Sequence, residues 1–191
     1  MSARKPSGPK RYLKRFWRSR RGATAVEFAL IAPILITLYC GMAEMTQAMM
    51  AQRRLSNIAS AIGDLVAQSS QTGPLKTNDI FKIGNTIMAP FPTTGALKMC
   101  LVSITSNSTG KDTVAWSKPS VSNMTNCPAP GAVLTDVSTG VLPANQSVIM
   151  ARVSYTYTPA IKMFLPSGLT FNRTYYLRPR KTDTVLWNTA S

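Results

Sequence analysis

An apolar run near the N-terminus constrains this chain more than any other feature. Residues 23–43 contain one charged side chain, Glu27. As an α-helix, these residues would extend about 31 Å at roughly 1.5 Å per residue. That length matches the hydrocarbon core of a bilayer, which is about 30 Å thick. The sequence therefore predicts one membrane-spanning helix over residues 23–43.

Much of the positive charge of the chain precedes this run. The formal net charge is +15, and residues 1–21 hold nine Lys or Arg and no acidic residue. Basic residues beside a span keep their end in the cytoplasm. We therefore expect residues 1–22 to be a basic cytoplasmic leader, with the part of the chain after the span on the outer side of the membrane. Tyr12, Phe16 and Trp17 among the basic residues leave a nucleic-acid-binding tail as an alternative, but the adjacent span favours topology and no nucleic-acid partner.

The residue types that most often carry catalysis are scarce. The chain has no histidine, and its seven acidic residues are spread along its length. Ser-His-Asp triads and most zinc sites need histidine. The sequence predicts a protein that is not an enzyme, with no cofactor, no metal site and no small-molecule substrate.

The helical pattern continues beyond the apolar run. One helix face carries apolar side chains at helical spacing: Leu55, Ile58, Ile62, Leu65 and Val66. A Ser-Ser-Gln-Thr-Gly-Pro stretch at 69–74 then ends the pattern. We expect residues 44–70 to be an amphipathic continuation of the membrane helix, packed on a periplasmic or extracellular domain of residues 71–191.

A short helix is expected at the start of this domain. It covers residues 77–89, is capped by Thr77 or Asn78, and ends before Pro90. Its inward side chains are expected to be Ile80, Phe81, Ile87 and Met88.

The later part of the domain has the two-residue period of strands. Alternation predicts half-buried strands at residues 149–157 and 169–177. Two more strands are expected at 98–105 and 112–116. Residues 117–146 are rich in Ser, Pro, Asn and Gly, and indicate a long surface loop. The expected fold class is α+β: a long N-terminal helix packed on a small antiparallel sheet.

Two of the three cysteines lie outside the span. Cys100 falls in a predicted strand and Cys127 in the long loop. An oxidising periplasm favours a disulfide between them, with two free thiols as the alternative. Asn-x-Ser/Thr triplets admit a eukaryotic glycoprotein, although chance explains them in a domain rich in these residues; they begin at Asn107, Asn123, Asn145 and Asn172.

The residues around the start of the span resemble the processing site of type IV pilin-like precursors. Gly22 is followed by Ala23-Thr24-Ala25-Val26 and then by Glu27-Phe28. The resemblance implies that a prepilin peptidase cuts between Gly22 and Ala23. It also implies that Glu27 of one subunit pairs with the new N-terminus of a neighbour, since buried charges are tolerable when paired. The alternative is that Glu27 snorkels to the headgroups or pairs with Arg20 or Arg21.

A longer segment, residues 20–68, resembles the TadE/TadG-like family of pilus assembly proteins, the pseudopilins of tight-adherence (Flp) systems. The matching features are Glu27-Phe28-Ala29-Leu30, Pro33, Gly41, Glu44 and Gln52-Arg53-Arg54-Leu55 before an Ala-rich helix. The resemblance implies a minor pilin required for assembly of a Tad/Flp pilus. Its implied partners are the membrane, the prepilin peptidase, the major pilin, other pseudopilins and the pilus platform machinery.

Two alternatives assign the apolar run differently. In one alternative it is a permanent anchor in an unprocessed single-span protein whose periplasmic domain binds a ligand or partner. In the other alternative it is a secretory signal peptide, cut after Gly41-Met42-Ala43. The mature N-terminus separates the three hypotheses: Ala23 for the pseudopilin, Glu44 for the secreted domain, and Met1 or Ser2 for the permanent anchor.

Overall fold

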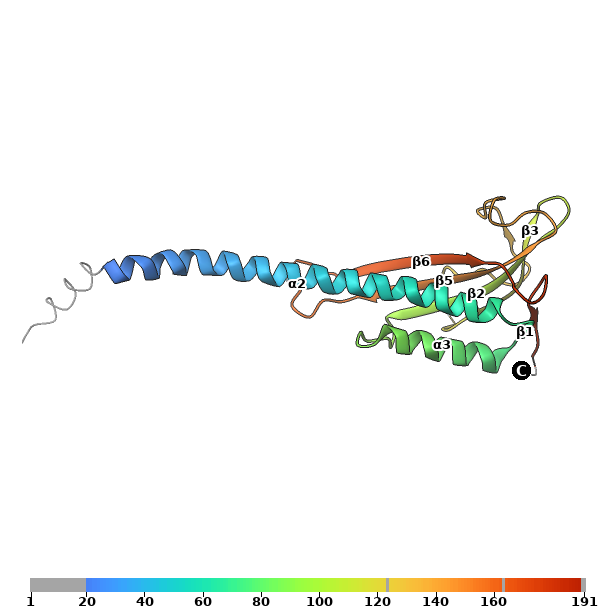
Figure 1. Ribbon diagram of the computed structural model, residues 1–191, viewed down its shortest axis with the longest axis horizontal. Coiled ribbons are helices and arrows are strands. Elements are labelled where there is room, and N and C mark those ends of the chain that lie inside the picture. Colours follow the sequence, from blue (N-terminus) through green and yellow to red (C-terminus); the bar gives the residue numbers. More distant parts are fainter. Residues whose placement is uncertain (1–19, 123, 163, 190–191) are drawn as a thin grey trace, which may run out of the picture.

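A single long helix dominates the architecture. The computed structural model describes residues 20–122, 124–162 and 164–189, with side chains from Gly22 onward. Helix α2 runs from Arg20 to Ala67 without a break, and Pro33 lies inside it. Its second half packs on the sheet domain, whereas its first half projects beyond that domain (Figure 1). The predicted continuity of the two halves is confirmed, while most of the basic leader lies outside the described residues.

The C-terminal end of α2 is held by the last part of the chain. The backbone N–H of Arg180 donates to the carbonyl of Ala67 at 2.9 Å. The guanidinium of Arg180 also forms an ion pair with Asp64 at 2.7 Å. Strand β1 (Gln71–Thr72) then pairs in parallel with β7 (Leu186–Trp187). The segment 69–74, expected as a helix-ending stretch, therefore also contributes a short strand.

Helix α3 (Pro74–Met88) begins three residues before the predicted start. Proline is favoured at the first helical position because its fixed φ suits the helix and its missing N–H would be unpaired there. Gly73 is the N-cap, so the predicted caps Thr77 and Asn78 are wrong. Thr77 is instead buried in the first turn, where its hydroxyl donates to the carbonyl of Gly73 at 2.8 Å. Three predicted inward residues are buried and one is partly buried: Ile80, Phe81, Met88 and, partly, Ile87.

The sheet has five antiparallel strands in the order β4-β3-β2-β5-β6. Their bounds are β2 Leu97–Ser106, β3 Asp112–Pro119, β4 Val133–Leu134, β5 Ser147–Tyr157 and β6 Leu169–Leu177. All four predicted strands are present, and β3 extends beyond its predicted end. The short edge strand β4 was not predicted. The α+β fold class, with a long helix on an antiparallel sheet, is confirmed.

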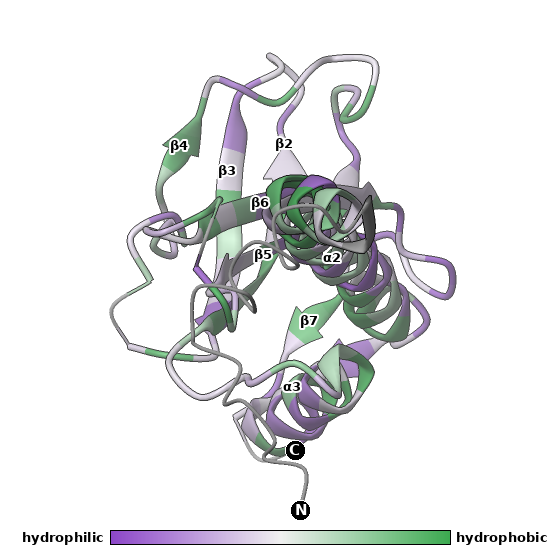
Figure 2. Cartoon of the chain, turned by 90° about the vertical axis from the view of Figure 1, so that its left-hand side faces the viewer, coloured by the Kyte–Doolittle hydropathy of each residue, from purple (hydrophilic) through white to green (hydrophobic). Residues whose placement is uncertain are grey.

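One face of the sheet packs against α2 and α3 (Figure 2). The side chains of Leu55, Ile58 and Ile62 are fully buried there. Helix and sheet approach closely at Gly63, where an added Cβ would lie 2.5 Å from Cδ1 of Leu177. Polar contacts reinforce this layer, because the guanidinium of Arg173 on β6 donates to the hydroxyl of Ser56 at 3.2 Å. The predicted apolar face of α2 is therefore the face that meets the sheet.

The other face of the sheet is covered by the long connection before β5. Met124, Val137 and Leu142 of that connection are buried against alternate side chains of β2 and β5. The prediction of a surface loop over residues 117–146 is therefore wrong for these apolar positions. The prediction of a half-buried strand is also wrong for the first half of β5, whose residues are buried on both faces. The physical reason is the same for both corrections, because a five-stranded sheet has two faces and α2 and α3 cover one.

A disulfide joins this covering segment to the sheet. Cys100 on β2 is bonded to Cys127, with a sequence separation of 27. Cys100 is fully buried in the second apolar cluster, and Cys127 packs against that cluster. The bridge therefore holds the covering segment to the face that it buries.

Opening this bridge should destabilise the domain. Cys127→Ser should lower the free energy of unfolding by about 3.5 kcal/mol, because the unfolded chain regains the entropy of a loop of this length. Chemical denaturation of the full chain in detergent, followed by circular dichroism, measures the change. A thiol reductant should destabilise the wild type equally and leave the variant unchanged.

Cys40→Ser is the matched control for this prediction, since Cys40 is not part of the disulfide. It should unfold like the wild type. Equal stability of Cys127→Ser and the wild type would contradict the stabilising role of the bridge.

Candidate functional site

The first half of α2 is apolar, and the rest of the described chain leaves it uncovered except at Gly41. We call residues 23–43 the bare half of α2. Its large apolar side chains are exposed: Val26, Phe28, Leu30, Ile31, Ile34, Leu35, Ile36, Leu38, Tyr39 and Met42. Within the described residues, α2 is the one helix long and apolar enough to cross a membrane. A helix that is apolar on all sides belongs in lipid or among other helices.

The predicted processing and assembly residues lie at the beginning of the bare half. Gly22 is half-buried, whereas Ala23, Glu27 and Phe28 are exposed. Ala23 and Glu27 are four residues apart, so they lie on one side of the helix, about 6 Å apart along its axis. Glu27 and Phe28 thus lie exposed on α2, away from the sheet domain.

No ion pair joins Glu27 to another side chain that the structure describes. The ion pairs among the described side chains join Lys82 to Asp79 and Arg180 to Asp64. The alternative partners Arg20 and Arg21 have side chains outside the described part of the structure.

Two hydroxyl groups, one in the bare half and one just after it, are paired within the helix itself. Thr37 donates to the carbonyl of Pro33, and Thr46 donates to that of Met42, both at 2.8 Å. Such bonds within one helix suit a hydrocarbon environment, where water is not at hand to pair polar groups.

A contact between α2 and the β5–β6 loop, residues 158–168, was missed by sequence reasoning. Glu44 is 3% exposed, and its carboxylate accepts a hydrogen bond from the backbone N–H of Phe164 at 3.0 Å. Gly41 is buried against the Phe164 ring, and an added Cβ there would lie 2.6 Å from Cε2. The signals available in the sequence were the apolar residues of this loop and, on the helix, a glycine and a glutamate one turn apart.

Tyr157 belongs to the same neighbourhood, at the end of β5. Burial raises the pKa of Tyr157, and the nearby carboxylate of Glu44 raises it further. Its phenol therefore remains neutral at physiological pH. The ring of Phe91 packs edge-on to Tyr157, with ring centroids 6.1 Å apart. This aromatic group closes the end of the sheet domain from which the bare half projects.

Among the residues that the structure describes, no three His, Cys, Asp or Glu side chains gather into a group able to hold a metal ion. The features that the site offers are an exposed apolar helix, an exposed carboxylate and a loop contact at the far end of the apolar run.

Comparison with known proteins bears on this helix. A family model described as TadE-like protein matches residues 22–63. The match starts at Gly22 and includes Glu27, Gly41 and Glu44. Neither a curated protein nor a solved structure matches the chain.

This match and the apolar helix together indicate a membrane-anchored, single-pass protein associated with a Tad pilus. Residues 22–63, which form most of α2, are thus similar to the TadE-like family of pilus assembly proteins.

Proposed function

We propose that this protein is a pseudopilin, a minor pilin required for assembly of a Tad/Flp-type pilus. The observation that carries the proposal is the bare half of α2, with Glu27 exposed one turn after Ala23 inside the TadE-like segment. Tad-type pilus proteins of this family are structural and assembly proteins. The proposed mechanism is accordingly subunit packing rather than catalysis.

Processing is the first step of this mechanism. A prepilin peptidase of the inner membrane cuts between Gly22 and Ala23, and the small Gly22 lets the enzyme approach the backbone closely. The cut removes the nine basic residues of the leader. It also creates an ammonium group at Ala23, at the start of the bare half.

Pairing of this ammonium with Glu27 of a neighbour is the second step. An unpaired charge in an apolar environment costs several kcal/mol, so pairing of the ammonium with the carboxylate is favoured there. Ala23 and Glu27 lie about 6 Å apart along the axis of one helix. A neighbouring helix displaced by about that distance brings its Ala23 level with Glu27, so the ion pair sets the register between subunits.

The unbroken α2 connects this packing to the position of the sheet domain. Residues 1–22 face the cytoplasm and the domain faces the periplasm, reaching the cell surface after assembly. The proposed partners along the helix are the major pilin and other pseudopilins, with the platform machinery and its ATPase driving assembly. The domain stands at one end of α2 (Figure 1), where it does not obstruct packing around the apolar turns.

An unprocessed single-span protein with a periplasmic binding domain would use the same helix as a permanent anchor. This alternative differs from the pseudopilin in its mature N-terminus, which a mass measurement identifies.

Processing should depend on Gly22. Intact-mass measurement of the membrane-extracted wild type should give a chain that begins at Ala23. Gly22→Leu should remain uncut, because the larger side chain prevents close approach of the peptidase. Ala25→Leu makes a similar change three residues later, and should be cut normally.

A wild-type chain that begins at Met1 or Ser2 would instead support the permanent anchor, and one that begins at Glu44 would support the signal peptide. Normal cutting of Gly22→Leu would contradict the proposed processing site.

Assembly should depend on the charge of Glu27. Glu27→Ala should be cut like the wild type but enter filaments at least about 100-fold less, because removal of one partner of a buried ion pair costs about 3 kcal/mol or more. Quantitative immunoblotting of sheared pili against the membrane fraction measures incorporation.

Exchange of Val26 and Glu27 is the matched variant, since it keeps composition and charge while turning the carboxylate by about 100° around the helix. Incorporation should be lost here too. Wild-type incorporation of Glu27→Ala would overturn the pairing. Wild-type incorporation of the exchange variant would show that the charge is needed but that its position on the helix does not set the register.

A further inference from the structure

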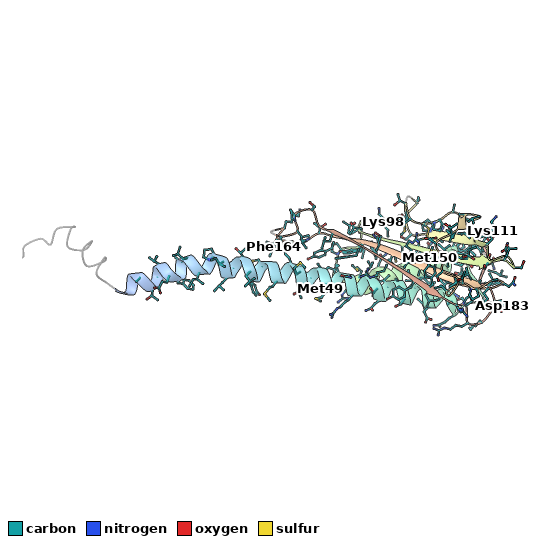
Figure 3. The ribbon with its side chains drawn as sticks, turned by 90° about the horizontal axis from the view of Figure 1, so that it is seen from above. Met49, Lys98, Lys111, Met150, Phe164 and Asp183 are labelled. Carbon is teal, nitrogen blue, oxygen red and sulfur yellow. A yellow bond between two sulfur atoms is a disulfide. The ribbon has the colours of Figure 1, made fainter. Side chains whose placement is uncertain are left out.

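The β5–β6 loop lies against α2 at the level of the apolar run. The buried stripe of α2 begins at Gly41, inside that run, and continues through Glu44, Ala48 and Ala51. Gly41 and Glu44 meet Phe164 of the loop. Figure 3 shows Phe164 beside α2, at the end of the sheet domain nearest the bare half. The contact between domain and helix therefore overlaps the segment that spans the membrane.

The depth of this contact follows from the helix rise. Gly41 is 18 residues after Ala23, or about 27 Å along the axis at roughly 1.5 Å per residue. That distance falls within the hydrocarbon core, which is about 30 Å thick. With residues 23–43 across the bilayer, a ring that touches Gly41 lies level with the last turn of the span.

The surface at this level is apolar and uncovered. Phe164 and Ile161 are each 51% exposed. Open hollows flank Phe164, and their walls are almost entirely apolar. Pro33, Ile34, Thr37 and Leu38 line one hollow, whereas Leu38, Gly41, Met42, Met45, Thr46 and Met49 line the other. This surface is continuous with the bare half of α2, unlike the isolated apolar side chains that are common on soluble proteins.

Two backbone N–H groups of the loop are paired inside the protein. The N–H of Phe164 donates to the carboxylate of Glu44, and the N–H of Gly168 donates to the carbonyl of Leu165 at 3.1 Å. Glu44 itself is buried between helix and loop rather than turned outward. Internal pairing is what a segment needs in order to enter a medium without water.

We infer that the β5–β6 loop is a second membrane contact of this protein. Ile161 and Phe164 enter the leaflet through which α2 emerges toward the sheet domain, and phospholipid acyl chains fill the hollows beside Phe164. The exposed Lys162 lies next to Ile161 in sequence, and its long side chain reaches the phosphate level. The inference rests on the membrane span of the proposed function.

Two contacts with one leaflet have a mechanical consequence. A helix alone can rotate about its axis in lipid, whereas a helix with a loop on one side presents a fixed face. The loop and the bare half leave the bilayer together when the subunit enters a filament. Neighbouring helices then take the place of the acyl chains beside Phe164.

Nitroxide labels on single cysteines test this contact in the full chain. The background is Cys40→Ser with the Cys100–Cys127 disulfide retained, in vesicles of phosphatidylethanolamine and phosphatidylglycerol. Labels are placed by Ile161→Cys and Phe164→Cys in the loop. Leu35→Cys in the bare half is the lipid reference, and Leu186→Cys on β7, at the opposite end of the domain, is the water reference. Collision rates with oxygen and with a nickel chelate report lipid and water, respectively.

The loop labels should show a ratio of oxygen to nickel collisions several-fold above that at 186 and close to that at 35. The Ile161 label decides the result, because it leaves the Phe164 ring in place against Gly41. A water-like ratio at 161 with a lipid-like ratio at 35 would overturn the loop contact and leave the span intact. A label at 161 protected from both reagents would mean that protein covers the loop, and would also overturn it. A water-like ratio at 35 would remove the span and the loop contact together.

Discussion

The unbroken course of α2 through two different environments is the constraint on which the rest of this structure depends. Its second half buries Leu55, Ile58 and Ile62 against the sheet, whereas its first half exposes apolar side chains on all sides. α2 is continuous although Pro33 cannot donate to its hydrogen-bond ladder, so whatever holds the first half also positions the domain. Lipid and neighbouring apolar helices are the media that satisfy the first half. Under the proposed function, the protein passes from lipid to the company of neighbouring helices without refolding.

The transition between the halves is gradual because the buried stripe starts with small side chains. Gly41, Ala48 and Ala51 let the loop and sheet approach the helix closely, and Leu55 begins the larger core side chains. Glu44 is the polar member of this stripe, and its hydrogen bond to the Phe164 amide ties the loop to the helix. Gly41 and Glu44 are therefore the residues of α2 that hold the β5–β6 loop of the sheet domain.

Local patterns were sufficient to predict the longer helices and strands, but not the short strands β1, β4 and β7 or the long-range partners of any element. Helical spacing identified the packed face of α2, and two-residue alternation identified β5 and β6. β2 lacks this alternation, because Met99 to Val102 are all apolar and are buried on both faces of the sheet. A continuous apolar run does not show what covers each face. Met124, Val137 and Leu142, scattered in a polar segment, supply that cover. β1 also pairs with β7, and the Phe164 ring packs on Gly41. These contacts join residues that are distant in the sequence, and no periodic pattern predicts them.

The candidate site divides in the same way. Gly22 and Glu27 were identified because their spacing forms a motif, whereas Glu44 acquired a role only through the loop it contacts. Glu27 and Gly41 are 14 residues apart, or about 21 Å along α2. Under the proposed function, a neighbouring helix that passes both positions meets a charge at one and an apolar surface at the other. A buried ion pair offsets the cost of desolvation only when its geometry is close, whereas apolar packing depends on area and is not directional. Glu27 therefore selects the register, and the surface around Phe164 adds adhesion once that register is reached.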